Sequence, residues 1–189
     1  MPSNTVDKNK VRFNLKNTHY AVRTEAGYGT PVAIPGSVNM NLAPEGEATP
    51  FYADGLVYFN SISNQGYTGD YEAARFPDEM LKDIWGYTED DNKVLIENSN
   101  AEPKSFALLF QIDGDKNNDF YVFYNVTAQR PAIASSTNEK SKTPKTQSIS
   151  MSAVPLEDGR VLARTTAETT AEVKSSWFTT VYTGGNHAA

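Results

Sequence analysis

The chain has no cysteine among its 189 residues, which excludes disulfide bonds and cysteine-ligated metal sites. Histidine is scarce too: only His19 and His187 occur, and they form no metal-binding spacing. No stretch approaches the run of about 20 apolar residues that a membrane span needs. The polar N-terminus also lacks the apolar segment of a secretion signal. We therefore expect no metal site, no membrane partner and no secretory signal.

Lysine, arginine and histidine are also absent from residues 24–74, a block that contains six carboxylates. These are Glu25, Glu45, Glu47, Asp54, Asp70 and Glu72. The chain has 23 acidic and 17 basic residues, so outside this block 17 acids face 17 bases. The block thus carries the entire net charge of −6. A surface of one negative sign repels other anions, so we expect no direct binding of DNA or RNA.

What the sequence does contain is a series of short alternating apolar runs, which is typical of half-buried strands. Such runs predict strands at residues 11–15, 19–24, 37–42, 56–62, 67–73, 94–97, 105–112, 120–129, 148–154 and 161–165. One helix is predicted between Pro77 and Gly86, with the apolar stripe Met80, Leu81, Ile84 and Trp85. The pattern predicts a mainly β fold, an antiparallel β-sandwich or barrel with one flanking α-helix.

The length favours a single domain over residues 1–189, with four segments outside the strands. Residues 1–10 are expected to form a flexible N-terminal arm. Residues 43–55 and 130–146 are expected to be long loops, the first of them alternatively the tip of a long hairpin. The C-terminal segment 166–189 is ambiguous, because 171–177 suits a helical turn whereas 177–183 alternates like a strand.

Candidate chemical motifs each fail on a required residue. Asp113, Asp115, Asn117 and Asp119 have the odd spacing of a calcium loop. That loop also needs Gly at its sixth position and Glu at its twelfth, where this chain has Asn118 and Tyr124. A polar hairpin loop between two strands is therefore the interpretation.

The remaining chemistry is equally sparse. His19 lies in a predicted strand and is interpreted as a partly buried strand histidine rather than a catalytic base. The pair Asp70 and Glu72 is interpreted as a solvated strand face rather than a glycosidase pair, and Gly27-Tyr28-Gly29 lacks the rest of a phosphate loop. We predict no catalytic, cofactor-binding or metal-binding residue, and hence no enzyme.

Aromatic residues are concentrated where the 43–55 segment ends. Phe51 and Tyr52 are followed by Tyr58 and Phe59, a composition common at protein interfaces. A solvated loop whose aromatics begin the next strand is the alternative. Long strands also leave sheet edges that a neighbouring subunit can cover.

Several spaced motifs resemble one family. They are His19-Tyr20-Ala21, Tyr28-Gly29-Thr30-Pro31-Val32, Ile34-Pro35-Gly36-Ser37-Val38, Phe51-Tyr52-Ala53-Asp54, Gly66-Tyr67-Thr68-Gly69, the helix from Phe76 to Gly86, Phe106-Ala107-Leu108 and Tyr124 to Pro131. Their order, across about residues 11–156, resembles that of the major tail tube proteins of bacteriophages with long non-contractile tails.

The resemblance implies a structural virion protein, made in the host bacterial cytoplasm, that polymerises as stacked hexameric rings. Inner strands of six subunits would join into a β-barrel around the channel through which genomic DNA is delivered, without specific DNA binding. The implied partners are further copies of the chain and other tail proteins, namely the tape measure, tail terminator and distal tail proteins. No cofactor is implied.

Two sets of site residues follow as hypotheses. Asp70 and Glu72 are expected to face the lumen, because a cation-free wall offers phosphates no sticking point. Phe51, Tyr52, Asp54 and Gly55 are expected to contact a neighbouring subunit or ring, with Asp54-Gly55 as a turn. The alternatives are the tube protein of a contractile tail or secretion apparatus, and, in a different class, a carbohydrate-binding β-sandwich module.

Overall fold

The structure is a computed structural model that describes residues 8–137 and 144–185. Outside the described residues lie 1–7, 138–143 and 186–189, the last of which contains His187. Within the described part, the fold is mainly β, and every paired strand is antiparallel to its neighbour. The predicted fold class is confirmed.

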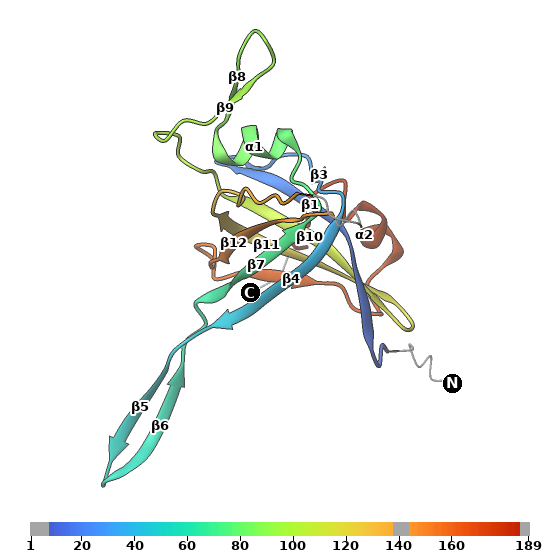
Figure 1. Cartoon of the computed structure of the whole chain (residues 1–189). Helices are drawn as coiled ribbons and strands as arrows, with labels where there is room; N and C mark the ends of the chain where they lie inside the picture. The colour runs from blue at the N-terminus through green and yellow to red at the C-terminus, as the bar shows by residue number, and fades with distance from the viewer. Residues whose placement is uncertain (1–7, 138–143, 186–189) are drawn as a thin grey trace.

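Thirteen strands and two short helices occur in the described part of the chain, one helix more than expected (Figure 1). The strands are β1 (Arg12–Thr24), β2 (Gly27–Tyr28), β3 (Val32–Ala33), β4 (Ser37–Glu45), β5 (Ala48–Ala53), β6 (Leu56–Ile62), β7 (Gly66–Ala73), β8 (Thr88–Glu89), β9 (Leu95–Ile96), β10 (Phe106–Gly114), β11 (Asn118–Ala128), β12 (Gln147–Ala153) and β13 (Leu162–Arg164). The helices are α1 (Asp78–Trp85) and α2 (Ala171–Ser176).

Nine strands form one curled sheet with the order β2-β1-β10-β11-β12-β7-β4, in which β13 pairs with β11 and β3 with β1. The strands β4 and β1 approach each other without being paired, so the sheet resembles a partly closed barrel. Two hairpins, β5–β6 and β8–β9, project from opposite ends of this body (Figure 1). The chain therefore has a core and two projections.

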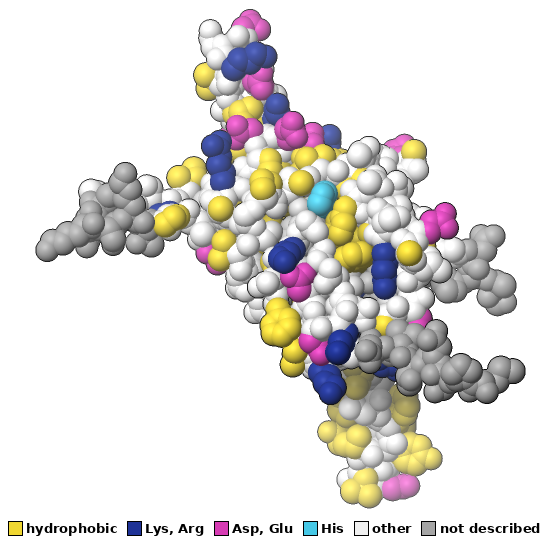
Figure 2. Space-filling view, turned by 90° about the vertical axis from the view of Figure 1, so that its right-hand side faces the viewer, with side chains coloured by type: hydrophobic (Ala, Val, Ile, Leu, Met, Phe, Trp, Pro, Cys, Tyr) yellow, Lys and Arg dark blue, Asp and Glu magenta, His cyan; other side chains and the backbone are white. Residues whose placement is uncertain are grey.

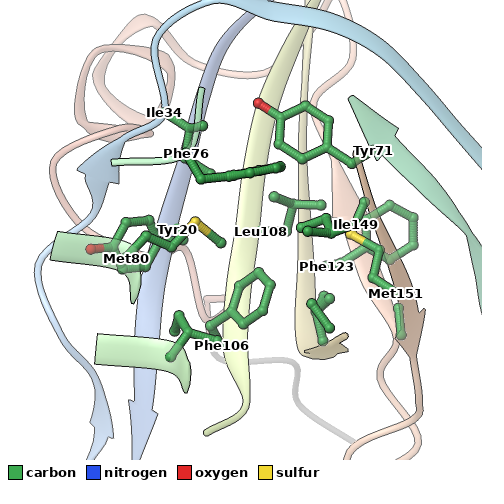
Figure 3. Close-up of a cluster of buried hydrophobic side chains, with 14 of the residues drawn as sticks. Tyr20, Ile34, Tyr71, Phe76, Met80, Phe106, Leu108, Phe123, Ile149 and Met151 are labelled. Carbon is green, nitrogen blue, oxygen red and sulfur yellow. The ribbon is translucent and has the colours of Figure 1, made fainter. Parts of the chain in front are cut away.

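The main core lies inside the curl of the sheet, where aromatic and aliphatic side chains from the strands meet α1 (Figure 3). The predicted helix stripe is confirmed, since Met80, Ile84 and Trp85 are fully buried in this cluster. Gly86 ends the helix in the left-handed conformation at φ 68°, as expected for a helix that stops at glycine. The Trp85 indole N–H donates to the carbonyl of Ala128 at 3.0 Å, which ties α1 to β11.

One acidic side chain of α1 also holds the helix to the sheet. The Tyr20 hydroxyl donates to the carboxylate of Asp83 at 2.9 Å, joining β1 to the helix. Burial, together with this bond to a carboxylate, raises the pKa of Tyr20 well above its usual value. The hydroxyl therefore stays protonated, and remains a hydrogen-bond donor, at neutral pH.

A second, smaller core covers the opposite face of β1, β10 and β11. Its main contributor is the C-terminal segment, in which Trp177 and Val181 are buried and the Trp177 indole donates to the carbonyl of Tyr121 at 3.2 Å. The helical alternative for 171–177 is confirmed by α2, whereas 177–183 forms no strand. Because β10 is covered on both faces, its first six residues are all buried.

Two expected boundaries are wrong. The runs 11–15 and 19–24 form the single strand β1, which is irregular between Lys16 and His19 and has Asn17 at φ 49°. A β-bulge of this kind interrupts the alternation that made one strand look like two. Residues 43–55 are not a long loop, because most of them belong to β4 and β5; only the hairpin alternative was correct. The described part of 130–146 has no helix or strand.

The acidic turn between β10 and β11 is bonded to residues at and just before the start of β1. Lys10 N–H donates to Asp115 at 2.7 Å, and Lys16 pairs with Asp113 at 2.6 Å. These bonds lower the pKa values of both carboxyl groups. Asn9 also bonds Asn117, so the flexible arm expected over 1–10 does not extend to residues 9 and 10.

Candidate functional site

The hairpin β5–β6 is a projecting arm, and we call residues 48–62 the arm. Its strands are joined by a two-residue turn in which Asp54 has φ 53° and Gly55 has φ 79°. Two consecutive residues with positive φ define the type I′ hairpin turn, for which Asp-Gly is a preferred sequence. The turn expected at these two residues is confirmed.

The arm is unusual because its large apolar side chains are exposed (Figure 2, lower end). Seven of them are between 54 and 77 % exposed: Phe51, Tyr52, Leu56, Val57, Tyr58, Phe59 and Ile62. An isolated two-stranded hairpin is only marginally stable in water, and a contiguous exposed apolar patch marks an interaction site. The arm is therefore a candidate interaction surface.

The arm is firmly joined to the body. Backbone bonds continue from the β4–β7 pair into the arm, with Gln65 N–H donating to Glu45 at 2.9 Å and Ser63 N–H donating to Glu47 at 3.0 Å. At this junction a Cβ on Gly46 would overlap the carbonyl oxygen of Ser63, so the close approach of the two strands requires glycine there. The four strands thus form one continuous ribbon.

The second feature is a surface of mostly polar side chains on β4, β7, β12 and the end of β11, which we call the polar face. Tyr71 and Ala73 of β7 point into the core, so by strand alternation Asp70 and Glu72 point away from it. The strand register places their neighbours directly beside them. The polar face consists of Asn39, Asn41 and Ala43 of β4, Thr68, Asp70 and Glu72 of β7, Ser148, Ser150 and Ser152 of β12, and Thr127 of β11.

Hydrogen bonds across the strands fix the two acids of the polar face. Ser150 donates to Asp70 at 2.6 Å, and Thr146 donates to Glu72. The polar face has no cation and no large apolar group, and it remains uncovered by the C-terminal segment, which packs on other strands. The structure therefore places both predicted acids together on a largely exposed, anionic surface.

Sequence reasoning identified these two acids but missed most of the polar face. The alternation of serines in 148–152 is visible in the sequence, yet nothing local shows that this strand pairs with β7. Likewise, Phe51 and Tyr52 were expected at an interface, while Leu56, Val57 and Ile62 were read only as part of a strand. The residues of the arm surface are identified by the exposure of their side chains in the structure, which composition alone does not show.

The histidine that the structure describes, His19, is held by contacts within the fold. His19 is half-buried in β1, stacks on Phe178 and bonds the Asn17 carbonyl through Nδ1 at 2.8 Å, in agreement with the predicted strand histidine. Over residues 8–137 and 144–185, no group of three or more acids or histidines is placed to hold a metal ion. In the same residues no helix is long and apolar enough to cross a membrane.

Tryptophans, which often stack on sugars, are both buried here. Trp85 is fully enclosed and Trp177 is 2 % exposed. The exposed aromatics are instead Phe and Tyr side chains of the arm, together with Phe13 at the N-terminal end of β1. A carbohydrate-binding surface built on exposed aromatic side chains would therefore use the arm or Phe13.

Comparison with known structures gives several similar chains, two of which are described below. No family model and no curated protein sequence matches the chain. A chain of the anti-feeding prophage cap, which terminates a tube, aligns over 87 % of this chain and 99 % of its own length, with 13 % identity and a TM-score of 0.41. A chain of the PVC sheath-tube complex, from an extracellular contractile injection system in the extended state, aligns over 79 % of this chain and 88 % of its own, with 14 % identity and a TM-score of 0.41. Scores at this level establish neither a shared fold nor a shared function.

Proposed function

We propose that this protein is a structural subunit that polymerises into a tube, and that it acts as the major tail protein of a bacteriophage with a long non-contractile tail. The observation that carries the proposal is the arm, with its seven exposed large apolar side chains. Burying one such side chain contributes about 1.5–3 kcal/mol, so covering several drives association strongly. The ordered motifs that resemble tail tube proteins support the same role.

The polar face supplies the second requirement of a tail tube, a wall past which DNA can slide. In the proposed assembly six subunits form a ring, the rings stack, and the polar face lines the channel. Asp70 and Glu72 repel phosphates, and the neighbouring serine, threonine and asparagine side chains carry no charge to hold them. The tube would be part of the virion and join the tape measure, terminator and distal tail proteins.

Removal of the arm tests the proposal. Replacing residues 48–62 with Asn-Gly joins Glu47 to Ser63, which already share a backbone hydrogen bond, through a favoured two-residue turn. We expect concentrated wild-type protein to show rings or tubes with sixfold end views by negative-stain electron microscopy. The shortened variant should remain monomeric by native mass spectrometry, with the far-ultraviolet circular dichroism of a folded β protein.

Two outcomes would contradict the proposal. The first is normal tubes from the shortened variant, which would remove the arm from assembly. The second is a wild-type protein that stays monomeric at all concentrations, even with tail components present, and binds a glycan saturably. That result would favour the carbohydrate-binding alternative.

A further inference from the structure

The register of the arm divides its apolar side chains between two faces. Phe51 lies opposite Phe59, and Tyr52 lies opposite Val57, with an irregularity between the two pairs. Because successive side chains of a strand point to opposite sides, these pairs lie on opposite faces. The first face holds Phe51, Leu56 and Phe59, and the second holds Tyr52, Val57 and Ile62. The seventh, Tyr58, lies at the irregularity and has no partner in the register.

The two faces are equally apolar and equally exposed. The first three side chains are 61, 72 and 62 % exposed, and the second three are 64, 54 and 77 % exposed. Strands that lie on a single surface alternate apolar and polar residues, with the polar side toward water. This arm has no polar side. An arm that docked on one surface would leave three large apolar groups in water.

The chain itself offers a partly apolar groove that its own arm does not cover. The groove, of about 660 Å3, lies between β1 and β4 where the main core opens. Its lining combines the apolar side chains Phe13, Leu15, Val38, Met40, Phe110 and Tyr121 with the polar residues Arg12, Asn14, Ser37 and Asn39. The arm projects away from the body instead of folding back over it (Figure 1). A contact between arm and groove therefore joins two copies, each giving an arm and receiving one.

Charge also favours another copy as the partner. The chain has a net charge of −6, which would repel a like copy, but the arm contains a single charged residue, Asp54. The rim of the groove near Phe13 carries the cation Arg12, whose guanidinium is 3.6 Å from Asp119. The arm itself, with one charge, thus adds little like-charge repulsion to a contact with another copy.

We propose that each arm is held between two other copies of this chain, one face in the β1–β4 groove of one copy and the opposite face against another. This inference rests on the proposed function, because it specifies how tube subunits are joined. A contact of this kind links three chains through each arm. It makes assembly depend on both faces at once.

The two faces are tested separately. One variant carries Phe51→Ser, Leu56→Ser and Phe59→Ser, and a second carries Tyr52→Ser, Val57→Ser and Ile62→Ser. We expect each to raise the protein concentration needed for assembly at least tenfold, as measured by light scattering and electron microscopy. The matched control Val94→Ser with Ile96→Ser, on the exposed β8–β9 hairpin, should assemble like the wild type.

The groove is tested by cross-linking, which is unambiguous because the chain has no native cysteine. A variant with both Phe59→Cys and Val38→Cys, treated with a short bismaleimide during assembly, should give a ladder of covalent oligomers. Either single variant should give at most dimers. A ladder is expected because each chain both gives and receives an arm.

The results separate this inference from the proposed function. Wild-type assembly into tubes with one face variant that assembles equally well would overturn the two-sided contact and leave the tube intact. Tubes without a covalent ladder would overturn the groove as the receiving surface. Loss of assembly in the β8–β9 control would overturn the specific role of the arm faces. No wild-type assembly under any condition would overturn the proposed function itself.

Discussion

Tubes built from a variant with Asn41→Lys, Thr68→Lys and Ser148→Lys should retain DNA that wild-type tubes release. The polar face now has two acids and no cation, so three lysines change its charge from −2 to +1 in each subunit. Each lysine that meets a phosphate releases counterions, which makes binding strong and salt-dependent. We expect at least a hundredfold increase in retention of short duplex DNA at low salt, measured by co-sedimentation with the tubes.

The position of the lysines is checked with a duplex carrying streptavidin at both ends, which cannot enter a channel. Lysine tubes should retain the free duplex and not the capped one. The control Glu79→Lys with Asn100→Lys also adds three positive charges, on exposed positions of α1 and of the loop after β9, and should retain the two duplexes equally. Equal retention of both duplexes by the lysine tubes would place the polar face on the outside.

Replacing Trp85 with Ala should cost about 3–5 kcal/mol of the free energy of unfolding, the range for removing a large aromatic from a core. Trp85 is fully buried and bonds the Ala128 carbonyl at 3.0 Å, so the substitution leaves both a cavity and an unpaired acceptor. The measurement is urea unfolding in the variant that lacks the arm, where assembly does not contribute to the transition.

Trp85→Phe separates the two effects. It keeps an aromatic ring but not the donor, and we expect a smaller loss of about 1–3 kcal/mol, the cost of a buried unpaired acceptor. Asn100→Ala, on an exposed loop, should change stability by less than about 0.5 kcal/mol. A loss for Trp85→Ala no larger than that of Asn100→Ala would show that α1 does not close the main core.

The sequence was sufficient for elements whose signals are local. Pro77 and Gly86 bracket α1, and Asp54-Gly55 specifies its turn through positive φ values. Alternation in 67–73 gave both the strand and the correct outward direction of Asp70. These features depend on residues within a few positions of each other, which is why they could be read directly.

Two prolines are the reason why residues 43–55 were predicted to be a loop. Pro44 and Pro50 both lie within strands, a place where proline usually argues against a strand. Pro44 lies in β4, the last strand of the sheet, and Pro50 lies in a two-stranded arm, so each strand has an edge without a partner. On a free edge the missing N–H costs no ladder bond, which makes proline compatible with both.

The pairing of strands that are distant in the sequence could not be predicted either. Ser150 and Asp70 are 80 positions apart in sequence, yet their strands are neighbours and their side chains bond. Nothing within β7 specifies which strand lies next to it. The polar face exists only once three distant strands are aligned in register, so sequence reasoning could find its acids but not the surface around them.

The continuous ribbon from β4 and β7 into the arm has a mechanical consequence. Hydrogen bonds between antiparallel strands lie perpendicular to the strands. A pull on the arm along its length acts on both of its strands and passes through them into β4 and β7. It therefore loads the ladder of bonds between β7 and β12 in shear, instead of opening those bonds one after another from an end. The bonds between Gln65 and Glu45 and between Ser63 and Glu47 hold the two strands together across the junction. Tension on the arm is thereby shared with the sheet of the body.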